Sequence, residues 1–176
     1  ARQLAATGLT ANLDFVRKAT HAWMPLGKQV AIIGGELVGL ELAEFLAEGR
    51  ARHPLYHCAP VAPFGDERPR LLIVGLAPGF HGANATGRPF TGDYAGVLLY
   101  ETLHRFGWAS VPVSTSRDDG LRLTGARITN AVKCVPPENK PETGEIRTCN
   151  HFLASELAAP PEARVILALG LVAHNA

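Results

Sequence analysis

The fold depends on residues 71–93, LLIVGLAPGFHGANATGRPFTGD, in which a short apolar run leads into a glycine-rich stretch. Residues 71–75 have the composition of a buried strand, and Gly75 and Pro78 prevent this strand from continuing. The backbone must therefore turn at the carboxyl edge of a sheet, which is where open α/β folds place their ligands. We take this loop, which ends at Asp93, as the chemical centre.

Composition indicates a soluble globular domain. The chain has 176 residues, of which 47% are apolar and 19% charged, which is enough for one sizeable core and excludes disorder. A formal net charge of +1 neither supports nor excludes binding to nucleic acid. The longest apolar runs fall far short of the ~20 residues that span a bilayer. Three cysteines and no signal peptide favour a cytoplasmic protein, which we expect to be a monomer.

The rest of the chain alternates predicted strands and helices. Helices are predicted over residues 94–106 and 142–157, and strands over residues 127–132 and 163–170, the last of them buried. This alternation predicts an α/β fold with a parallel sheet covered on both faces. The proline-rich residues 51–70 read as an irregular connection, so we divide the chain into segments 1–53 and 54–176.

The first segment contains a predicted βα unit. A helix is predicted over residues 13–23, a strand over 30–33, and a helix over 40–47 after the glycines of residues 34–39. Residues 9–50 resemble part of the NAD-binding region of flavin-dependent pyridine-nucleotide oxidoreductases of the dienoyl-CoA reductase type. Glu36 stands at the second glycine of G-x-G-x-x-G, where its charge would oppose a phosphate. The alternatives are an FAD- or NAD(P)-dependent oxidoreductase and a structural appendage, and Glu36 favours the appendage.

A longer resemblance begins near residue 56. Its motifs are FGD at residues 64–66, GLAPGFHGANATGRPFTGD at 75–93, RITNAVKCVPPENKP at 127–141, ILALG at 166–170, and Ala173-His174. In this order and spacing they resemble the family 5 uracil-DNA glycosylases. The resemblance implies a three-layer αβα sandwich with a central parallel sheet, here preceded by an extra βα unit. It also implies a DNA repair enzyme that hydrolyses the N-glycosidic bond of uracil, or of another deaminated base, in DNA.

The matched positions imply a pocket for a base taken out of the DNA. Phe90 stands where the family stacks an aromatic ring on uracil, and Asn130 where an amide reads the uracil edge. An asparagine suits this role because its amide offers both a donor and an acceptor. The turn from Gly75 to Gly79, through Leu76, Ala77 and Pro78, would lie against the base with its backbone amides. The structural alternative is a core phenylalanine and an asparagine that caps a turn.

Asp93 is the candidate catalytic residue. The resemblance implies that it orients or activates the attacking water, and the apolar Leu76 transfers that burden to it because related families carry an acidic or polar residue there. The alternative role of Asp93 is to cap the helix that begins at residue 94. His81 and Asn84 are secondary candidates for contacts with phosphate or sugar, although Asn84 could equally be a turn residue.

Cys134 and Cys149 match two ligands of the [4Fe-4S] cluster of the family, which takes four thiolates. The other two belong to a C-x-x-C near the N-terminus of the family, which the oxidoreductase-like segment replaces. Cys58 is either a third ligand or an ordinary thiol. The family also continues past the position of Ala176 into a histidine-containing loop, for which His174 is no substitute. We therefore expect a C-terminally truncated enzyme of weak activity, or else an inactive DNA-binding or relic fragment.

Overall fold

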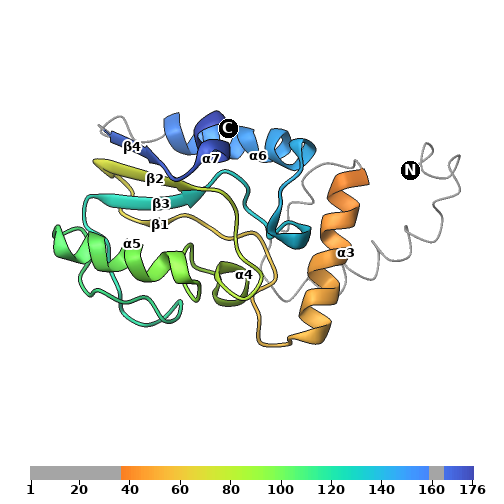
Figure 1. Ribbon diagram of the computed structural model, residues 1–176, viewed down its shortest axis with the longest axis horizontal. Coiled ribbons are helices and arrows are strands. Elements are labelled where there is room, and N and C mark those ends of the chain that lie inside the picture. Colours follow the sequence, from red (N-terminus) through yellow and green to blue (C-terminus); the bar gives the residue numbers. More distant parts are fainter. Residues whose placement is uncertain (1–36, 159–164) are drawn as a thin grey trace, which may run out of the picture.

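The apolar run at residues 71–75 forms the centre of a four-stranded sheet (Figure 1). The computed structural model describes residues 37–158 and 165–176. The strand order is β1 (Phe64–Gly65), β3 (Ala126–Asn130), β2 (Leu71–Gly75) and β4 (Val165–Ala168). Both β3 and β4 pair with β2 in parallel, which confirms the predicted parallel sheet for these three strands. The two-residue strand β1 is antiparallel to β3 and was not predicted, because two residues carry no periodic signal.

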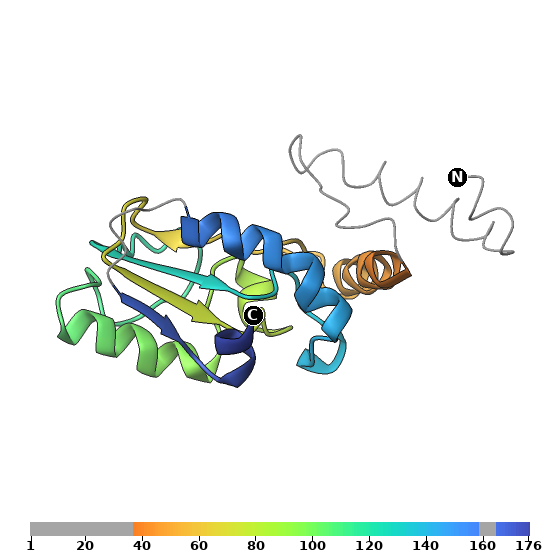
Figure 2. The ribbon, with the colours of Figure 1, turned by 90° about the horizontal axis from the view of Figure 1, so that it is seen from above.

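Helices cover both faces of this sheet, as Figure 2 shows. On one face, Ile73 of β2 shares a core with Tyr100 and Leu103 of α5 (Tyr94–Arg105). On the other face, Leu72 and Val74 pack with side chains of α6 (Thr143–Ala158) and α7 (Leu171–Asn175). The alternating side chains of a single strand thus bind the two helical layers together. The α/β class and the helices predicted over residues 94–106 and 142–157 are confirmed within one or two residues at their ends.

The predicted helix at residues 40–47 is also present, as the longer α3 (Leu37–Arg52). Leu46 of this helix packs into a buried cluster with Cys134 and Val135, flanked by Phe45 and Phe80. The predicted helix at residues 13–23, the strand at 30–33 and residues 34–36 of the glycine motif lie outside the described residues. The division at residue 53 stays a prediction, and the end of the first segment shares a core with the second.

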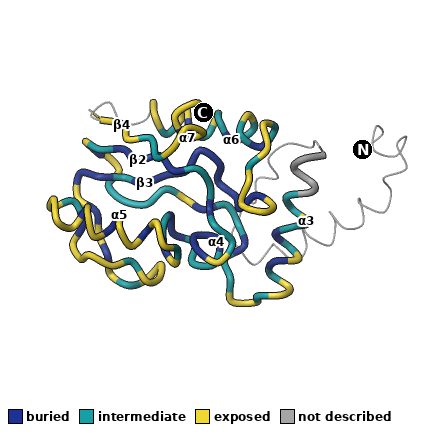
Figure 3. Tube along the Cα trace, in the orientation of Figure 1, coloured by how far each residue is buried: buried dark blue, intermediate teal, exposed yellow. Residues whose placement is uncertain are grey.

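The prediction of a buried strand at residues 163–170 is wrong in its burial. The strand β4 covers Val165–Ala168, and its first three residues are 55%, 55% and 43% exposed. Figure 3 shows this exposure along β4. The physical reason is its place in the sheet, because within the described residues β4 pairs only with β2 and is an edge strand.

Two short helices fall in segments for which the sequence predicted no regular structure. The loop after β2 contains α4 (Ala83–Thr86), and the turn after β3 contains the single 3-10 turn η2 (Pro137–Asn139). Both lie beyond the carboxyl ends of their strands, on the side of the sheet where the candidate site was predicted. Among the helices of the described residues, none combines the length and apolar character needed to cross a bilayer.

Candidate active site

Gly75, the last residue of β2, is the point at which Phe90 and Asn130 meet. It pairs with Asn130 in the parallel register of β2 and β3. A Cβ atom at Gly75 would lie 2.6 Å from the Phe90 ring and would overlap the side-chain oxygen of Asn130. Because real carbon contacts are about 3.5–4.0 Å long, only glycine leaves both side chains in place. The two residues predicted to recognise a base therefore share one site at the carboxyl edge of the sheet.

The Asn130 side chain carries an unsatisfied hydrogen-bond acceptor. Its Oδ1 atom is buried and has no hydrogen-bond partner among the described residues. A buried polar atom without a partner typically costs about 1–3 kcal/mol, so its burial here needs an explanation. An N–H group of a bound base would supply the missing partner.

The backbone around Phe90 is held in an unusual conformation. Phe90 has a φ of 54°, which lies in a region that residues other than glycine rarely occupy. Its neighbours fix it there: Tyr100 donates to the carbonyl of Pro89 at 2.7 Å, and the hydroxyls of Thr91 and Ser114 lie 2.6 Å apart. The ring of Phe90 is thus positioned before any ligand arrives.

A buried ion pair ties the same loop to residues 110–120. Arg88 is 3% exposed and donates to Asp119 at 2.7 Å, to Ser114 at 2.9 Å and to the carbonyl of Arg117 at 2.6 Å. Burial alone would raise the pKa of Asp119, but backbone N–H groups and Arg88 outweigh it and hold the pKa below the ordinary value of 3.8. These positioning residues were missed. Arg88 lies inside the motif at residues 75–93. Nothing in the sequence around Asp119 indicates that Asp119 is the partner of Arg88.

Asp93 caps α5, as the structural alternative predicted. Its Oδ1 atom accepts a hydrogen bond of 2.9 Å from the backbone N–H of Gly96. Its Oδ2 atom faces Gly82, where a Cβ atom would lie only 2.8 Å away. The two carboxylate oxygens therefore have different surroundings. One is used by the helix, and the other is directed toward the glycine-rich loop.

In the turn between Gly75 and Gly79, two carbonyl groups accept hydrogen bonds, whereas the backbone N–H groups donate none within the described residues. The carbonyls of Gly75 and Leu76 accept hydrogen bonds of 2.9 Å from Ala131 and Val132, which fasten the turn to the end of β3. The N–H groups of Leu76, Ala77 and Gly79 donate to no acceptor in the described part of the chain, and Pro78 has no N–H. Such amides are suited to bind a carbonyl oxygen or an anion.

His81 and Asn84 lie apart from the Phe90–Asn130 pair. His81 is exposed, and its Nδ1 atom is 2.9 Å from the hydroxyl of Tyr56. Asn84 is fully buried and donates to the carbonyl of Phe80 at 3.2 Å, which helps to hold the loop, and its Oδ1 atom, like that of Asn130, has no partner among the described residues.

Cys134 and Cys149 are both buried, and burial shifts the pKa of each thiol. Burial, with the nearby Cys149 and Glu145, raises the pKa of Cys134 to about 12. Burial also raises the pKa of the Cys149 thiol. Cys58 lies under Gly49 of α3 and beside Asn84, whose amide is 3.6 Å from its sulfur.

The donor set does not fit a cluster of four thiolates. The sequence contains only these three cysteines, and the apolar Leu46 of α3 packs directly on Cys134. Because a [4Fe-4S] cluster is ordinarily held by four thiolates, we derive no chemistry through it for this chain.

The fold is that of an α/β protein whose candidate site lies at the carboxyl edge of a mostly parallel sheet. Residues 62–176 match the model of the uracil DNA glycosylase superfamily, and the chain belongs to this superfamily. It is 51% identical over 121 residues to the Type-5 uracil-DNA glycosylase of Thermus thermophilus, covering 69% of this chain and 55% of that protein. It is 50% identical over 116 residues to the Type-5 enzyme of Mycobacterium leprae, covering 65% and 51%.

A more distant relative is the Type-4 uracil-DNA glycosylase of Thermotoga maritima, 38% identical over 111 residues, which cover 62% of this chain and 49% of that protein. The higher identity to Type-5 proteins confirms the resemblance drawn from the motifs. The chain spans about half the length of the curated relatives it matches.

Proposed function

We propose that this chain removes uracil from DNA by hydrolysing the N-glycosidic bond, as its relatives' names imply for them. The observation that carries the proposal is the meeting of the Phe90 ring and the Asn130 amide over Gly75, with Asn130 Oδ1 buried and given no partner by any residue that the structure describes. The partner is then DNA that contains uracil or another deaminated base, and the biological role is DNA repair. We propose no cluster among the cofactors of this 176-residue chain.

Recognition of uracil follows from the chemistry of these groups. An extruded base stacks on the Phe90 ring, and its N3–H donates to Asn130 Oδ1 while O4 accepts from the amide nitrogen. Cytosine has an acceptor at N3 and an amino group in place of O4, so with the amide in this orientation it would set acceptor against acceptor and donor against donor. The pocket thus discriminates between the two pyrimidines by the hydrogen bonds it demands.

The reaction needs charge stabilisation on both sides of the bond. As N1–C1′ breaks, its electron pair leaves with the uracil, whose O2 gains negative charge and accepts from the unused amides of Leu76, Ala77 and Gly79. The sugar becomes cationic, and a water oxygen forms the new bond to C1′. The free side of Asp93, Oδ2, holds this water and accepts its proton while Oδ1 stays on the helix.

Asp93→Asn separates these two roles of Asp93. Asparagine caps helices about as well as aspartate, so α5 and the unfolding temperature should be unchanged. The amide cannot accept the proton, so we expect uracil release from single- and double-stranded oligonucleotides to be lost under single-turnover conditions. Equal release by wild type and Asp93→Asn would contradict the catalytic role. No release by a folded wild-type chain that still binds DNA would favour the non-catalytic alternative.

A further inference from the structure

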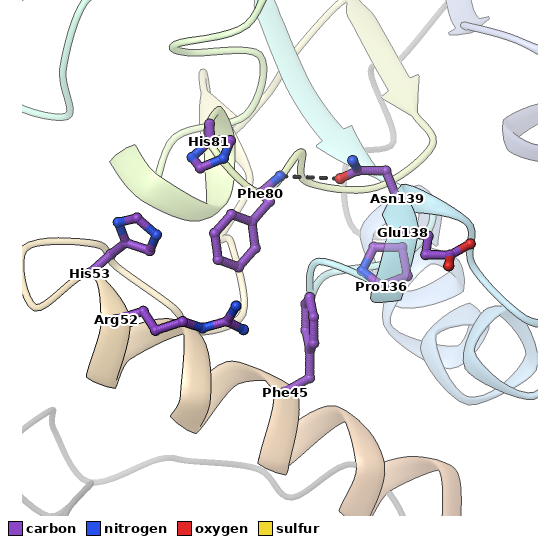
Figure 4. A pocket seen from close by; sticks show the side chains of 8 residues that line it. All are labelled: Phe45, Arg52, His53, Phe80, His81, Pro136, Glu138 and Asn139. Carbon is purple, nitrogen blue, oxygen red and sulfur yellow. Dashed lines mark hydrogen bonds between the residues drawn. The ribbon is translucent and has the colours of Figure 1, made fainter.

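A pocket of about 380 Å³, which we call the second pocket to distinguish it from the proposed base site, is lined by residues of α3, of the glycine-rich loop and of the turn at η2 (Figure 4). Phe45, Arg52 and His53 line it from α3 and its end, and Phe80 and His81 line it from the glycine-rich loop. Pro136, Glu138 and Asn139, in the turn at η2, line its remaining wall. None of the residues that we assign to the base pocket or to the chemistry lines it.

The two sites share one loop. Phe80 and His81 directly follow the turn that ends at Gly79, and Gly82 comes next, packed against the carboxylate of Asp93. The carbonyl of His81 is also in contact range of Gly92, the residue before Asp93. His81 and Gly82 therefore connect the lining of this pocket to Asp93.

Rings dominate the walls of this pocket. Phe80 makes edge contacts with Phe45 at 5.8 Å, with His53 at 5.7 Å and with His81 at 5.0 Å between ring centroids. Figure 4 shows Phe45 on α3 and Phe80 on the loop opposite. Aromatic faces of this kind stack on any nucleobase, because every base has a π-face.

Polar groups suited to a phosphate stand at the rim. Arg52 is largely exposed, and its one ion pair within residues 37–158 and 165–176 is a long one, 3.6 Å, with Glu48. The ring of His81 is oriented through Nδ1 by Tyr56, which leaves Nε2 for a ligand. Glu138 is the opposing charge, but its side chain is 83% exposed and lies 3.9 Å from Lys140.

The wall at η2 is held in a strained shape. Glu138 and Asn139 have φ values of 54° and 56°, and two successive residues in this region are rare outside glycine. The side-chain oxygen of Asn139 accepts from the backbone N–H of Phe80 at 3.2 Å, which ties the turn to the opposite wall. Backbone strain of this kind concentrates at ligand sites.

We propose that this pocket binds a nucleotide of the DNA strand next to the target, with its base on Phe45 and Phe80 and its phosphate on Arg52 and His81. The inference rests on the proposed function, which it deepens by adding a subsite that α3 builds. It makes α3 part of the DNA-binding surface of this chain.

The test uses a single-stranded oligonucleotide with one uracil and 2-aminopurine at one of several positions on either side of it. The protein carries Asp93→Asn, so that no base is released and fluorescence reports stacking alone. We expect quenching at one or two positions only. Phe45→Leu should abolish it and raise Kd about fivefold or more, whereas Leu55→Ala, at a 96% exposed residue outside the pocket, should not.

A second arm tests the phosphate. Arg52→Gln should weaken binding and lower the slope of log K against log salt by about 0.7, the value expected for one contact to a single strand. Arg105→Gln removes an exposed cation in the last turn of α5, outside the pocket, and should leave quenching and its position unchanged. A salt slope that Arg52→Gln leaves unchanged, or that Arg105→Gln lowers equally, would contradict a phosphate site at Arg52.

A third arm uses free 2-aminopurine deoxyribonucleoside monophosphate to distinguish two sources of the same chemistry. Quenching of the free nucleotide without quenching in DNA would overturn the strand subsite and leave a site for a free nucleotide. Quenching of neither probe would overturn the proposal altogether. These readouts do not depend on catalysis, so a failure to release uracil would count against the proposed function and not against this pocket.

Discussion

Replacing Gly75 with alanine should close the base pocket. The added methyl carbon would lie 2.6 and 2.7 Å from two atoms of the Phe90 ring. Carbon atoms in contact are about 3.5–4.0 Å apart, so the ring must retreat by about 1 Å or the strand must shift. Overpacking of this size destabilises proteins by about 1–3 kcal/mol, and a displacement of about 1 Å at a catalytic site can lower the rate on the order of 10²-fold.

Uracil release and thermal unfolding of the Gly75→Ala protein measure the two effects. We expect kcat/KM to fall by about 10²-fold, and the unfolding temperature to fall by about 2–4 °C for each kcal/mol lost. Gly79→Ala is the matched control for stability, because nothing lies within 4 Å of its added carbon. The unfolding temperature of that control should be unchanged.

The cause can be assigned with a double substitution. Leucine at position 90 lacks the distal ring atoms that the new methyl group meets, so Phe90→Leu should remove the part of the stability loss that the ring causes, while the overlap with the Asn130 side-chain oxygen remains. Contacting residues show coupling energies of about 0.5–3 kcal/mol in such cycles. Additive losses in the double variant, or a Gly75→Ala protein with wild-type uracil release, would refute the contact between the two residues as the reason for glycine at this position.

Three further outcomes follow from the contacts. Asn130→Ala removes the buried, unpartnered oxygen, so stability should be unchanged or rise by about 1 kcal/mol while uracil release falls about tenfold or more, which denaturant unfolding and single-turnover assays check. The pKa of Asp119 is lowered in the folded chain, so its stabilising contribution is present above its ordinary value of 3.8 and is lost as the pH falls below that value; Asp119→Asn should weaken this acid dependence in urea titrations. Leu46→Ala should lose about 2–5 kcal/mol of stability, because Leu46 is buried in one cluster with Cys134 and Val135, and an iron chelator should leave the unfolding temperature unchanged, because three cysteines are one thiolate short of an ordinary cluster.

Periodic patterns predicted the elements that local sequence determines. The apolar run at residues 71–75, the helix that begins at residue 94 and the helix over residues 142–157 all appear where they were expected. These features depend on side-chain spacing along a single segment, which the sequence displays directly.

Long-range contacts left no comparable signal. Arg88 and Asp119 are 31 residues apart, and Asp119 lies in an irregular segment where no period points to a partner. The exposure of β4 depends on which strands stand beside it, and an apolar run reads the same in the middle of a sheet and at its edge. The packing of Leu46 on Cys134 joins two segments that resemble different families, so neither resemblance could foresee it.

Arg88 connects the missed contacts to the proposed chemistry. Its ion pair with Asp119 is buried, and breaking a buried pair costs about 3–5 kcal/mol because one charge is left uncompensated. The loop that this pair holds carries Phe90 at one side and Asp93 three residues later, so both the stacking ring and the carboxylate depend on it. Residues 110–120 thus belong to the site, although we assign them no contact with the base. Substitutions in that segment should lower uracil release through the position of Phe90, and DNA affinity at the second pocket should be preserved.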